Sequence, residues 1–291
     1  MSSKVYVLGG GWVGSRLAST SSAYVVTSRD AEKVASSPIP CVKFDVADET
    51  TYSSLPTNPA DVAGVVITFP LSMDMVASLQ KVLEQLLGDT KKPVVVLSTS
   101  SSYAAKNYLD VVNENSPMTG LGVDGKPLTS RVDAEQALLS TKFEVVVLHL
   151  SGICGDEDDS GMGGSRAVRT WFERGYFPKA AYALVNLVHV ADVIRIIEFV
   201  LSNHNNGAAA WKGERFLVSA GAFRWGDLAQ ALSHNPLPET IPVEDMDSFR
   251  RSKLISIEKV LGLLGTEFVF SPPVAGVVPI SQGLATLSAP F

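Results

Sequence analysis

The residues best suited to chemistry stand near the N-terminus, where residues 4–18 read KVYVLGGGWVGSRLA. Gly9, Gly11 and Gly14 follow the spacing GxGxxG, between a short apolar run and a helix-like segment. In such a turn the first glycine permits the tight bend, the second lets a phosphate approach the backbone, and the third lets helix and strand pack closely. The unpaired N–H groups at the helix start can then bind a phosphate. The spacing predicts a dinucleotide-binding loop rather than a glycine turn without a ligand, with Gly10 as a variable position.

The next apolar run ends in Thr27-Ser28-Arg29-Asp30, which bears on the choice of dinucleotide. An acidic residue at this strand end usually binds the ribose 2′-hydroxyl of NAD, whereas a basic one accommodates the 2′-phosphate of NADP. Arg29 offers a planar guanidinium that can hold a phosphate through two hydrogen bonds, with Ser28 beside it. We therefore expect NADP(H), and NAD(H) is the alternative if Asp30 reaches the ribose.

Composition excludes several other classes of function. The chain has 291 residues, a net charge of −6 and no run of Lys or Arg, which argues against a nucleic-acid or acidic-membrane surface. Two distant cysteines and four histidines provide no disulfide framework and no metal site, so we expect a reducing compartment, either the cytoplasm or an organelle reached through a transit peptide. No run approaches the ~20 apolar residues of a membrane span. The expected partner is a small-molecule substrate. The sequence does not decide the oligomeric state, and a homodimer is one alternative.

The elements that must position the glycine loop alternate between strands and helices. Six short runs are rich in β-branched residues, as in strands buried on both faces of a parallel sheet; they are residues 4–8, 23–27, 41–44, 64–69, 93–99 and 143–150. Apolar residues recur at helical spacing in residues 72–87, 130–139 and 189–201. The alternation predicts an α/β fold, a doubly wound parallel sheet of the Rossmann type.

The strand-helix alternation ends near residue 150. Residues 155–165 are acidic and rich in glycine, which predicts a loop. A further strand is expected at 214–220, and mainly helical segments at 224–233 and 246–265. The predicted domains are an NAD(P)-binding Rossmann domain at 1–150, to which 184–220 return, and a smaller C-terminal substrate lobe made of 151–183 and 221–291.

Longer segments match the motifs of one family in the same order along the chain. They are KFDVAD (43–48), VITFPLS (66–72), VVVLSTSSSYAA (94–105), VNENSPMT (112–119), TSRVDAEQAL (129–138), VVVLHLSGICG (145–155), VNLVHVADVIRII (185–197) and GERFLVSAGAFRWGDLAQAL (213–232). With these segments the sequence resembles an extended short-chain dehydrogenase/reductase of the NAD-dependent epimerase/dehydratase superfamily. The resemblance implies a cofactor site made of Gly9, Gly11, Trp12, Val13, Gly14, Ser28, Arg29, Asp45, Val46, Thr68, Phe69, Pro70 and Arg131.

The catalytic pair of that family is missing. In the family a Tyr four residues before a Lys acts as general acid and base, and the Lys holds the nicotinamide ribose. Aligned with this motif, Pro127 stands at the Tyr position and Arg131 at the Lys position. Arg131 can hydrogen-bond a ribose but cannot shuttle a proton, because its guanidinium stays protonated. The sequence thus resembles the atypical branch of the family, which keeps the glycine loop and lacks the Tyr-Lys pair.

Three residues around the end of the fifth run are the candidates for catalysis. Thr99 falls where the family has the Ser or Thr that binds the substrate oxygen, and Ser100 stands beside it. The alternative is that these hydroxyl residues merely end a strand. Tyr103 is the candidate replacement for the missing acid, and the alternative is an aromatic residue packed in the core.

Other polar residues have structural interpretations as well as functional ones. We expect Glu114 to brace its loop, Asp192 to brace the start of a helix, and His149 to be a satisfied core histidine. His189 is a candidate contact on the substrate side. Lys253 either faces an anionic substrate or is a surface charge.

Two hypotheses about function follow from these residues. The first is an oxidoreductase or epimerase-like enzyme of the atypical branch, which passes a hydride between NADP(H) and a small carbonyl substrate. The second is a non-catalytic NADP(H)-binding sensor or assembly or scaffold protein, which the missing Tyr-Lys pair favours.

Overall fold

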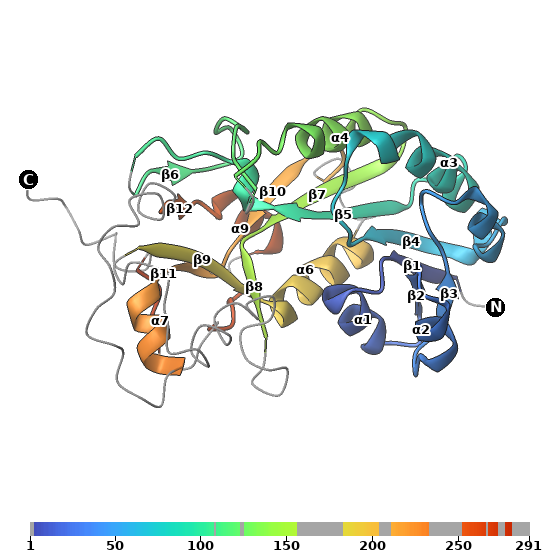
Figure 1. Ribbon diagram of the computed structural model, residues 1–291, viewed down its shortest axis with the longest axis horizontal. Helices are drawn as coiled ribbons and strands as arrows, with labels where there is room; N and C mark the ends of the chain where they lie inside the picture. The colour runs from blue at the N-terminus through green and yellow to red at the C-terminus, as the bar shows by residue number, and fades with distance from the viewer. Residues whose placement is uncertain are drawn as a thin grey trace, which may run out of the picture. The chain divides into compact units, whose positions relative to one another are not determined.

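The computed structural model of the chain (Figure 1) describes residues 3–107, 109–122, 125–155, 183–203, 211–232, 252–265, 267–272 and 277–280. The predicted loop at 155–165 lies outside these residues beyond Gly155, as do His204 and His234. No helix in the described part of the chain is long and apolar enough to cross a membrane.

The predicted parallel sheet is present and has seven strands. Its spatial order is β10-β7-β5-β4-β1-β2-β3. The strands are β1 (Lys4–Leu8), β2 (Tyr24–Ser28), β3 (Cys41–Lys43), β4 (Val62–Ile67), β5 (Pro93–Thr99), β7 (Glu144–Leu150) and β10 (Arg215–Val218). β1 pairs in parallel with β2 on one side and with β4 on the other, so the strand order reverses at β1. Dinucleotides bind at such a reversal point in doubly wound folds, and the predicted fold class is confirmed.

Helices cover both faces of this sheet. They are α1 (Trp12–Ser19), α2 (Ala31–Ser36), α3 (Val76–Leu87), α4 (Thr129–Leu139) and α6 (Val190–Asn203). Figure 1 shows α3 and α4 on one face and α1 on the other. Leu79 and Leu83 of α3 and Leu138 of α4 are fully buried, and they share one apolar cluster with residues of β4, β5 and β7. The helical spacing of apolar residues in 72–87 and 130–139 therefore faces the sheet as predicted.

Short 3-10 turns connect several of these elements. They are η1 (Glu49–Ser54), η2 (Pro59–Asp61), η3 (Met73–Met75) and η4 (Ser100–Ser102). The first residues of the predicted helix 72–87 form η3, and the α-helix itself begins at Val76.

The described residues also form two smaller sheets and two further helices. β9 (Leu184–His189) pairs in parallel with β8 (Gly152–Cys154) and antiparallel with β11 (Gly221–Arg224). β12 (Leu254–Ile255) pairs in parallel with β6 (Val111–Val112). The helices are α7 (Trp225–Leu232) and α9 (Glu258–Leu264).

The prediction of a mainly helical segment at 246–265 is confirmed for 258–264 and wrong for 252–257. Residues 252–257 lie outside helix and include β12 (Leu254–Ile255), and helix begins only at Glu258. The backbone of Leu254 bonds to Asp110 in a distant part of the sequence, and such pairing overrides the local helical pattern.

The chain divides into two compact units. The first unit comprises Met1–Ser98, Pro127–His149 and Ile196–Phe216, and the second comprises Thr99–Lys126, Leu150–Arg195 and Leu217–Phe291. The predicted domain boundaries at residues 150, 184 and 220 stay a prediction.

Candidate functional site

The glycine turn of the first unit lies between β1 and α1, and its motif residues Gly9 and Gly14 leave no room for a side chain. Gly9 has a φ of +117°, which favours glycine. Its N–H donates to Thr27 Oγ1 at 3.0 Å, and Thr68 Oγ1 donates to its carbonyl at 2.8 Å. A Cβ at Gly14 would lie 2.0 Å from the Gly9 carbonyl oxygen. Glycine is therefore needed at both positions for α1 to pack against the turn.

The two middle glycines of the turn have opposite surroundings. The prediction that Gly10 is a variable position is wrong, because a Cβ there would lie 2.8 Å from the backbone oxygen of Thr27. At Gly11 a Cβ would meet no atom of the described chain within 4 Å. The second glycine of the motif thus borders open space, as expected for the position that a phosphate approaches.

The start of α1 provides backbone donors beside this space. Gly11 is the N-cap of the helix, no side chain caps it, and its first turn contains no acidic residue. The first N–H groups of a helix lack partners within the helix and lie at its positive dipole end. Trp12 and Val13 are partly buried in this turn, and the Arg16 guanidinium lies 5.1 Å from the centre of the Trp12 ring. The arrangement is suited to binding an anion.

Asp30 and Arg29 after β2, and Lys43 on the neighbouring strand β3, differ in their contacts. Asp30 is the N-cap of α2, and its Oδ1 accepts two backbone N–H groups of that helix at 2.9 and 3.3 Å. Arg29 is exposed and has no hydrogen bond or ion pair with any described residue. Lys43 of β3 stands opposite Ser28 in the parallel register. Sequence reasoning missed Lys43, because its position beside Ser28 depends on strand pairing.

The segment after β3 contains the predicted adenine contacts Asp45 and Val46. The Asp45 carboxylate accepts the N–H of Ala47 at 3.0 Å, and the Asp45 N–H donates to Thr51 Oγ1 at 3.0 Å. The carbonyl of Val46 accepts a buried hydrogen bond of 2.6 Å from the Tyr52 hydroxyl. These bonds hold the backbone of the segment, and its contact with an adenine stays a prediction.

The residues after β4 lie against the glycine turn. Thr68 bonds to the Gly9 carbonyl, and the ring of Phe69 reaches within 3.3 Å of the place where a Gly9 Cβ would stand. Phe69 also packs against the main apolar cluster, whereas Pro70 is exposed. The first unit therefore brings the ends of β1, β2 and β4 together around one turn.

Arg131 is the third residue of α4, and one of its nitrogens makes no hydrogen bond with the described residues. Nε is buried and makes no hydrogen bond with the described residues. A buried polar group without a partner costs about 1–3 kcal/mol, which an acceptor on a ligand would offset. Pro127 is exposed before α4 and has no side-chain proton to offer.

A buried charged network lies beneath the end of β5, and sequence reasoning singled out only one of its members. Glu135 and His149 are both fully buried, and His149 Nε2 bonds to Glu135 Oε2 at 2.9 Å. Ser98 Oγ donates to the other carboxylate oxygen, and Arg215 Nε lies 3.6 Å from Oε2. Burial alone would raise the pKa of Glu135, but His149, Ser98 and Arg215 together hold it below the ordinary value. The prediction that His149 is a satisfied core histidine is confirmed.

In the second unit, the three predicted catalytic residues extend from Thr99, the last residue of β5, into the turn that follows it. Thr99 is partly exposed, and its Oγ1 accepts the N–H of Ser101 at 3.1 Å. Ser100 is 7% exposed. Tyr103 is 1% exposed and packs against Val112 and Leu217. This packing favours the interpretation of Tyr103 as a core aromatic residue, and Thr99 is the most accessible of the three.

Two acidic residues of the second unit act as braces, as predicted. Glu114 accepts the N–H of Leu217 at 2.8 Å. Asp192 is fully buried and bonds to Arg195 at 2.9 Å, to Ser271 Oγ at 3.0 Å and to the Ser271 N–H. Both carboxylates accept hydrogen bonds from other parts of the chain.

His189 and Lys253 of the second unit are both withdrawn from solvent. His189 is 8% exposed, and its Nδ1 accepts the N–H of Ala191 at 3.2 Å. Lys253 is half-buried, and its Nζ donates to the carbonyls of Ser100 and Tyr103. Lys253 is therefore not a surface charge.

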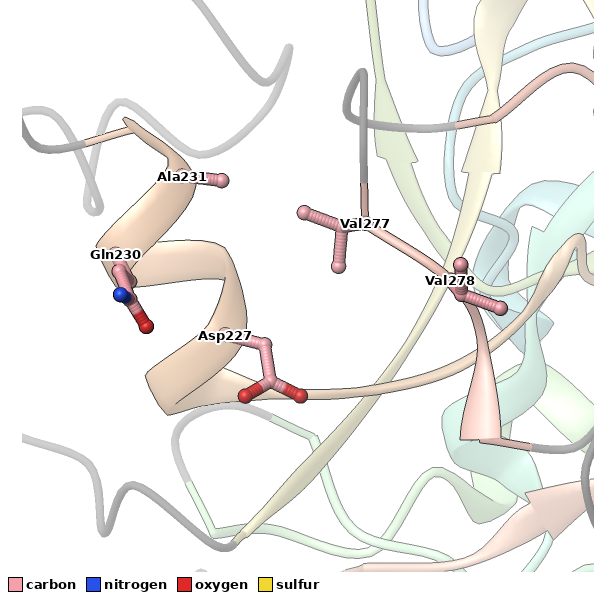
Figure 2. A pocket seen from close by; sticks show the side chains of 5 residues that line it. All are labelled: Asp227, Gln230, Ala231, Val277 and Val278. Carbon is pink, nitrogen blue, oxygen red and sulfur yellow. The ribbon is translucent and has the colours of Figure 1, made fainter.

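A hollow of about 390 Å³ lies elsewhere in the second unit. Figure 2 shows Asp227, Gln230 and Ala231 on α7, across from Val277 and Val278 on an extended segment. None of the predicted site residues lines it among the described residues. No group of three or more metal-ligating side chains that could hold an ion is found in the described ranges.

Comparisons with known proteins agree on the fold. Neither a protein-family model nor a curated protein matches the sequence. Among solved structures, MoeE5 in complex with UDP-glucuronic acid and NAD is 18% identical, with 97% of both chains covered and a TM-score of 0.67. Yeast methylglyoxal/isovaleraldehyde reductase complexed with NADPH is 16% identical, covering 92% of this chain and 94% of its own, with a TM-score of 0.67.

Vestitone reductase from alfalfa (Medicago sativa) gives a similar result. It is 19% identical, with 92% of this chain and 93% of its own chain covered and a TM-score of 0.63. Identities this low establish the fold alone. The chain has the Rossmann-type fold of these solved structures along nearly its whole length.

Proposed function

We propose that this protein is an NADP(H)-dependent oxidoreductase that reduces a small carbonyl substrate. The observation that carries the proposal is the start of α1, where uncapped backbone donors border open space at Gly11. This is the place where a Rossmann fold binds pyrophosphate. The structural neighbours that contain NAD or NADPH share this fold, which supports a nicotinamide cofactor here.

The residues present fit a dinucleotide along the carboxyl edge of the sheet. Gly9, Gly11 and Gly14, with Trp12 and Val13, would hold the pyrophosphate. Asp45 and Val46 would contact the adenine, and Thr68, Phe69 and Pro70 would flank the cofactor beyond β4. The buried Nε of Arg131 lacks a partner in the described chain, and a ribose hydroxyl would accept a hydrogen bond from its N–H.

The surroundings of β2 support NADP(H) over NAD(H). Asp30 would be the ribose ligand of an NAD-dependent protein, but its carboxylate already accepts two N–H groups at the start of α2. Arg29 has its guanidinium available, and Lys43 stands beside Ser28. Two basic residues and a hydroxyl suit a 2′-phosphate, because a dianion gains most from charge-assisted hydrogen bonds.

The chemistry would divide between the cofactor and the chain. A bound reduced nicotinamide supplies a hydride to a carbonyl carbon. Thr99, partly exposed at the end of β5, would donate its hydroxyl proton in a hydrogen bond to the substrate oxygen, with Ser100 beside it. Tyr103 is packed in the core and is the weakest of the three predicted catalytic residues.

A second candidate function is binding of NADP(H) without turnover, in a sensor or scaffold. The presence of Pro127 and Arg131 in place of Tyr and Lys favours it, because neither can release a proton. The glycine turn supports both functions equally. Only turnover separates them.

Two measurements test the proposal. A ligand present at one hundred times its dissociation constant adds about 2.7 kcal/mol of stability, so thermal unfolding with NADPH and with NADH reports binding and preference. Absence of a shift with both nucleotides would refute the proposal. Oxidation of NADPH is then followed by absorbance over a panel of aldehydes, ketones and quinones. Binding without oxidation across the panel would favour the non-catalytic function.

A further inference from the structure

The first turn of α4 lies beyond the carboxyl ends of β5 and β7, within the first unit. Farther along the helix, Glu135 bonds to Ser98 near the end of β5 and to His149 near the end of β7. The helix leads into the amino end of β7, so it runs antiparallel to that strand. Arg131 precedes Glu135 by four residues, which places it about 6 Å along the helix axis and on the same face. Arg131 therefore lies past the strand ends, at the edge of the sheet where doubly wound folds bind ligands.

The guanidinium of Arg131 has no partner in the described chain. Nε is buried and makes no hydrogen bond with the described residues. The terminal nitrogens Nη1 and Nη2 also form no hydrogen bond or ion pair with them, and neither nitrogen is buried. The helix start itself is held in place, because Ser130 Oγ accepts the N–H of Met73 at 3.1 Å. A fixed backbone thus presents a guanidinium whose end is open to a ligand.

The acidic residue that shares this helix face does not neutralise Arg131. The Glu135 carboxylate bonds to His149 and Ser98 and lies 3.6 Å from Arg215 Nε, so its charge is already compensated. Asp133 stands two residues from Arg131 and therefore points away from it on the helix. Within the described ranges, Arg131 carries a positive charge without a counter-ion. A ligand with a negative charge would gain from charge-assisted hydrogen bonds at this place.

The shape and charge of a guanidinium favour a carboxylate among anionic groups. Its planar fork matches the two oxygens of a carboxylate, which lysine at the same position would not do. One guanidinium neutralises the single charge of a carboxylate, whereas a phosphate monoester would retain a net negative charge. When Nη1 and Nη2 bind the two oxygens, the buried Nε keeps its proton for the neutral ribose hydroxyl of the cofactor.

We propose that Arg131 binds the carboxylate of the substrate, so that the carbonyl compound reduced by this protein is an oxo acid. This inference rests on the proposed function and names its substrate class. Arg131 acts in binding and orientation only, and the transfer of hydride and proton is unchanged by it.

The first test measures Arg131 without turnover. Phenylglyoxal modifies accessible guanidinium groups, and peptide mass spectrometry reports the rate at each arginine. Arg131 is expected to react faster than Arg195, whose guanidinium bonds to Asp192 at 2.9 Å and lies over the Phe268 ring. An Arg131 that reacts no faster than Arg195 would overturn the inference, whatever the protein does with NADPH.

The same labelling tests the carboxylate. With saturating NADP⁺ present, glyoxylate, pyruvate, acetoacetate and 2-oxoglutarate are each compared with the corresponding methyl ester. At least one acid should slow the labelling of Arg131 while its ester does not, and the exposed Arg224 should react at the same rate throughout. If no acid protects Arg131 better than its ester, the inference is wrong.

The second test uses substrate preference and substitutions. Wild type should reduce the best oxo acid with a kcat/KM about 10²-fold higher than its methyl ester, because the ester cannot accept the charged fork. This preference should fall to about tenfold in Arg131→Lys and disappear in Arg131→Met. The ratio of the two substrates cancels any effect on the cofactor, since both use the same NADPH. Lys142→Met, which removes the same charge beyond the other end of α4, is the control and should keep the wild-type ratio.

The outcomes separate the inference from the proposed function. An unchanged ratio in Arg131→Met would overturn the inference, and an unchanged ratio in Arg131→Lys does so if the Met variant fails to fold. If neutral carbonyls are reduced and acids are not preferred, only the inference fails. If acids protect Arg131 but NADPH is oxidised with neither acids nor esters, the proposed function fails although the carboxylate site is present.

Discussion

Glycine-to-alanine substitutions in the glycine turn should show whether the turn binds a phosphate or has only a structural role. The Gly11→Ala side chain would enter the space beside the start of α1, where no described atom lies within 4 Å. Gly11 has a φ of −73°, an ordinary value for alanine. Without a nucleotide, the free energy of unfolding should therefore stay within about 0.5 kcal/mol of wild type. NADPH binding should weaken, because the methyl group occupies the path by which a phosphate approaches the backbone.

The expected size of the effect follows from linkage. At an NADPH concentration one hundred times the wild-type dissociation constant, wild type gains about 2.7 kcal/mol. A tenfold loss of affinity reduces this gain to about 1.4 kcal/mol, and a complete loss removes it. Chemical denaturation with and without NADPH measures both quantities on the same protein.

Gly14→Ala is the matched contrast. Its Cβ would lie 2.0 Å from the Gly9 carbonyl oxygen, a backbone atom, so α1 must shift away from β1. We expect a loss of roughly 3 kcal/mol without any nucleotide. If Gly11→Ala binds NADPH as wild type does, or destabilises the free protein as much as Gly14→Ala, the assignment of the open space to a phosphate is refuted.

Three further predictions concern the surroundings of the site. Arg29→Ala should weaken NADPH binding by about tenfold and leave NADH binding unchanged, because only NADPH has a 2′-phosphate; equal titration curves for wild type and variant would contradict it. Asp30→Ala should lower the free energy of unfolding, measured thermally or chemically, by about 1 kcal/mol, because the N-cap of α2 is lost. The ratio of NADPH to NADH affinity should stay unchanged. A shift of this ratio toward NADPH would show that Asp30 does bind the ribose. Glu135→Leu should lower the free energy of unfolding by roughly 3 kcal/mol at pH 7, because it removes the buried carboxylate to which His149 Nε2 bonds at 2.9 Å. Since the folded-state pKa of Glu135 lies below its ordinary value, the advantage of wild type should be present above about pH 4.3 and shrink as pH falls further; an advantage that grows on acidification would contradict the cited contacts.

Much of the sheet was predictable because its strands are buried on both faces. Runs such as 93–99 consist almost entirely of β-branched and apolar residues, and β5 covers the same residues. The glycine spacing likewise identified Gly9 and Gly14 as sterically required. The role of Gly10 was not predictable, because its neighbour is the carbonyl of Thr27 on another strand.

The charged residues of the second unit were harder to interpret from sequence. Lys253 lies about 150 positions from its hydrogen-bond partners Ser100 and Tyr103. A local pattern around 246–265 indicated helix, whereas pairing of β12 with β6 produces extended backbone at 254–255. Long-range pairing leaves no periodic signal in the segment itself, so a surface charge and a buried one look alike.

The sequence by itself determined the α/β fold and the position of the glycine turn, because hydrophobic periodicity and glycine spacing are local properties of the chain. It also determined that the Tyr-Lys pair is absent, since Pro127 and Arg131 occupy those positions. The tertiary structure decided which polar groups have hydrogen-bond partners within the chain and which can still bind a ligand. Asp30 caps a helix, Tyr103 is packed in the core, and Lys253 Nζ sits between two carbonyls, because the free energy of each group depends on neighbours brought from distant parts of the chain.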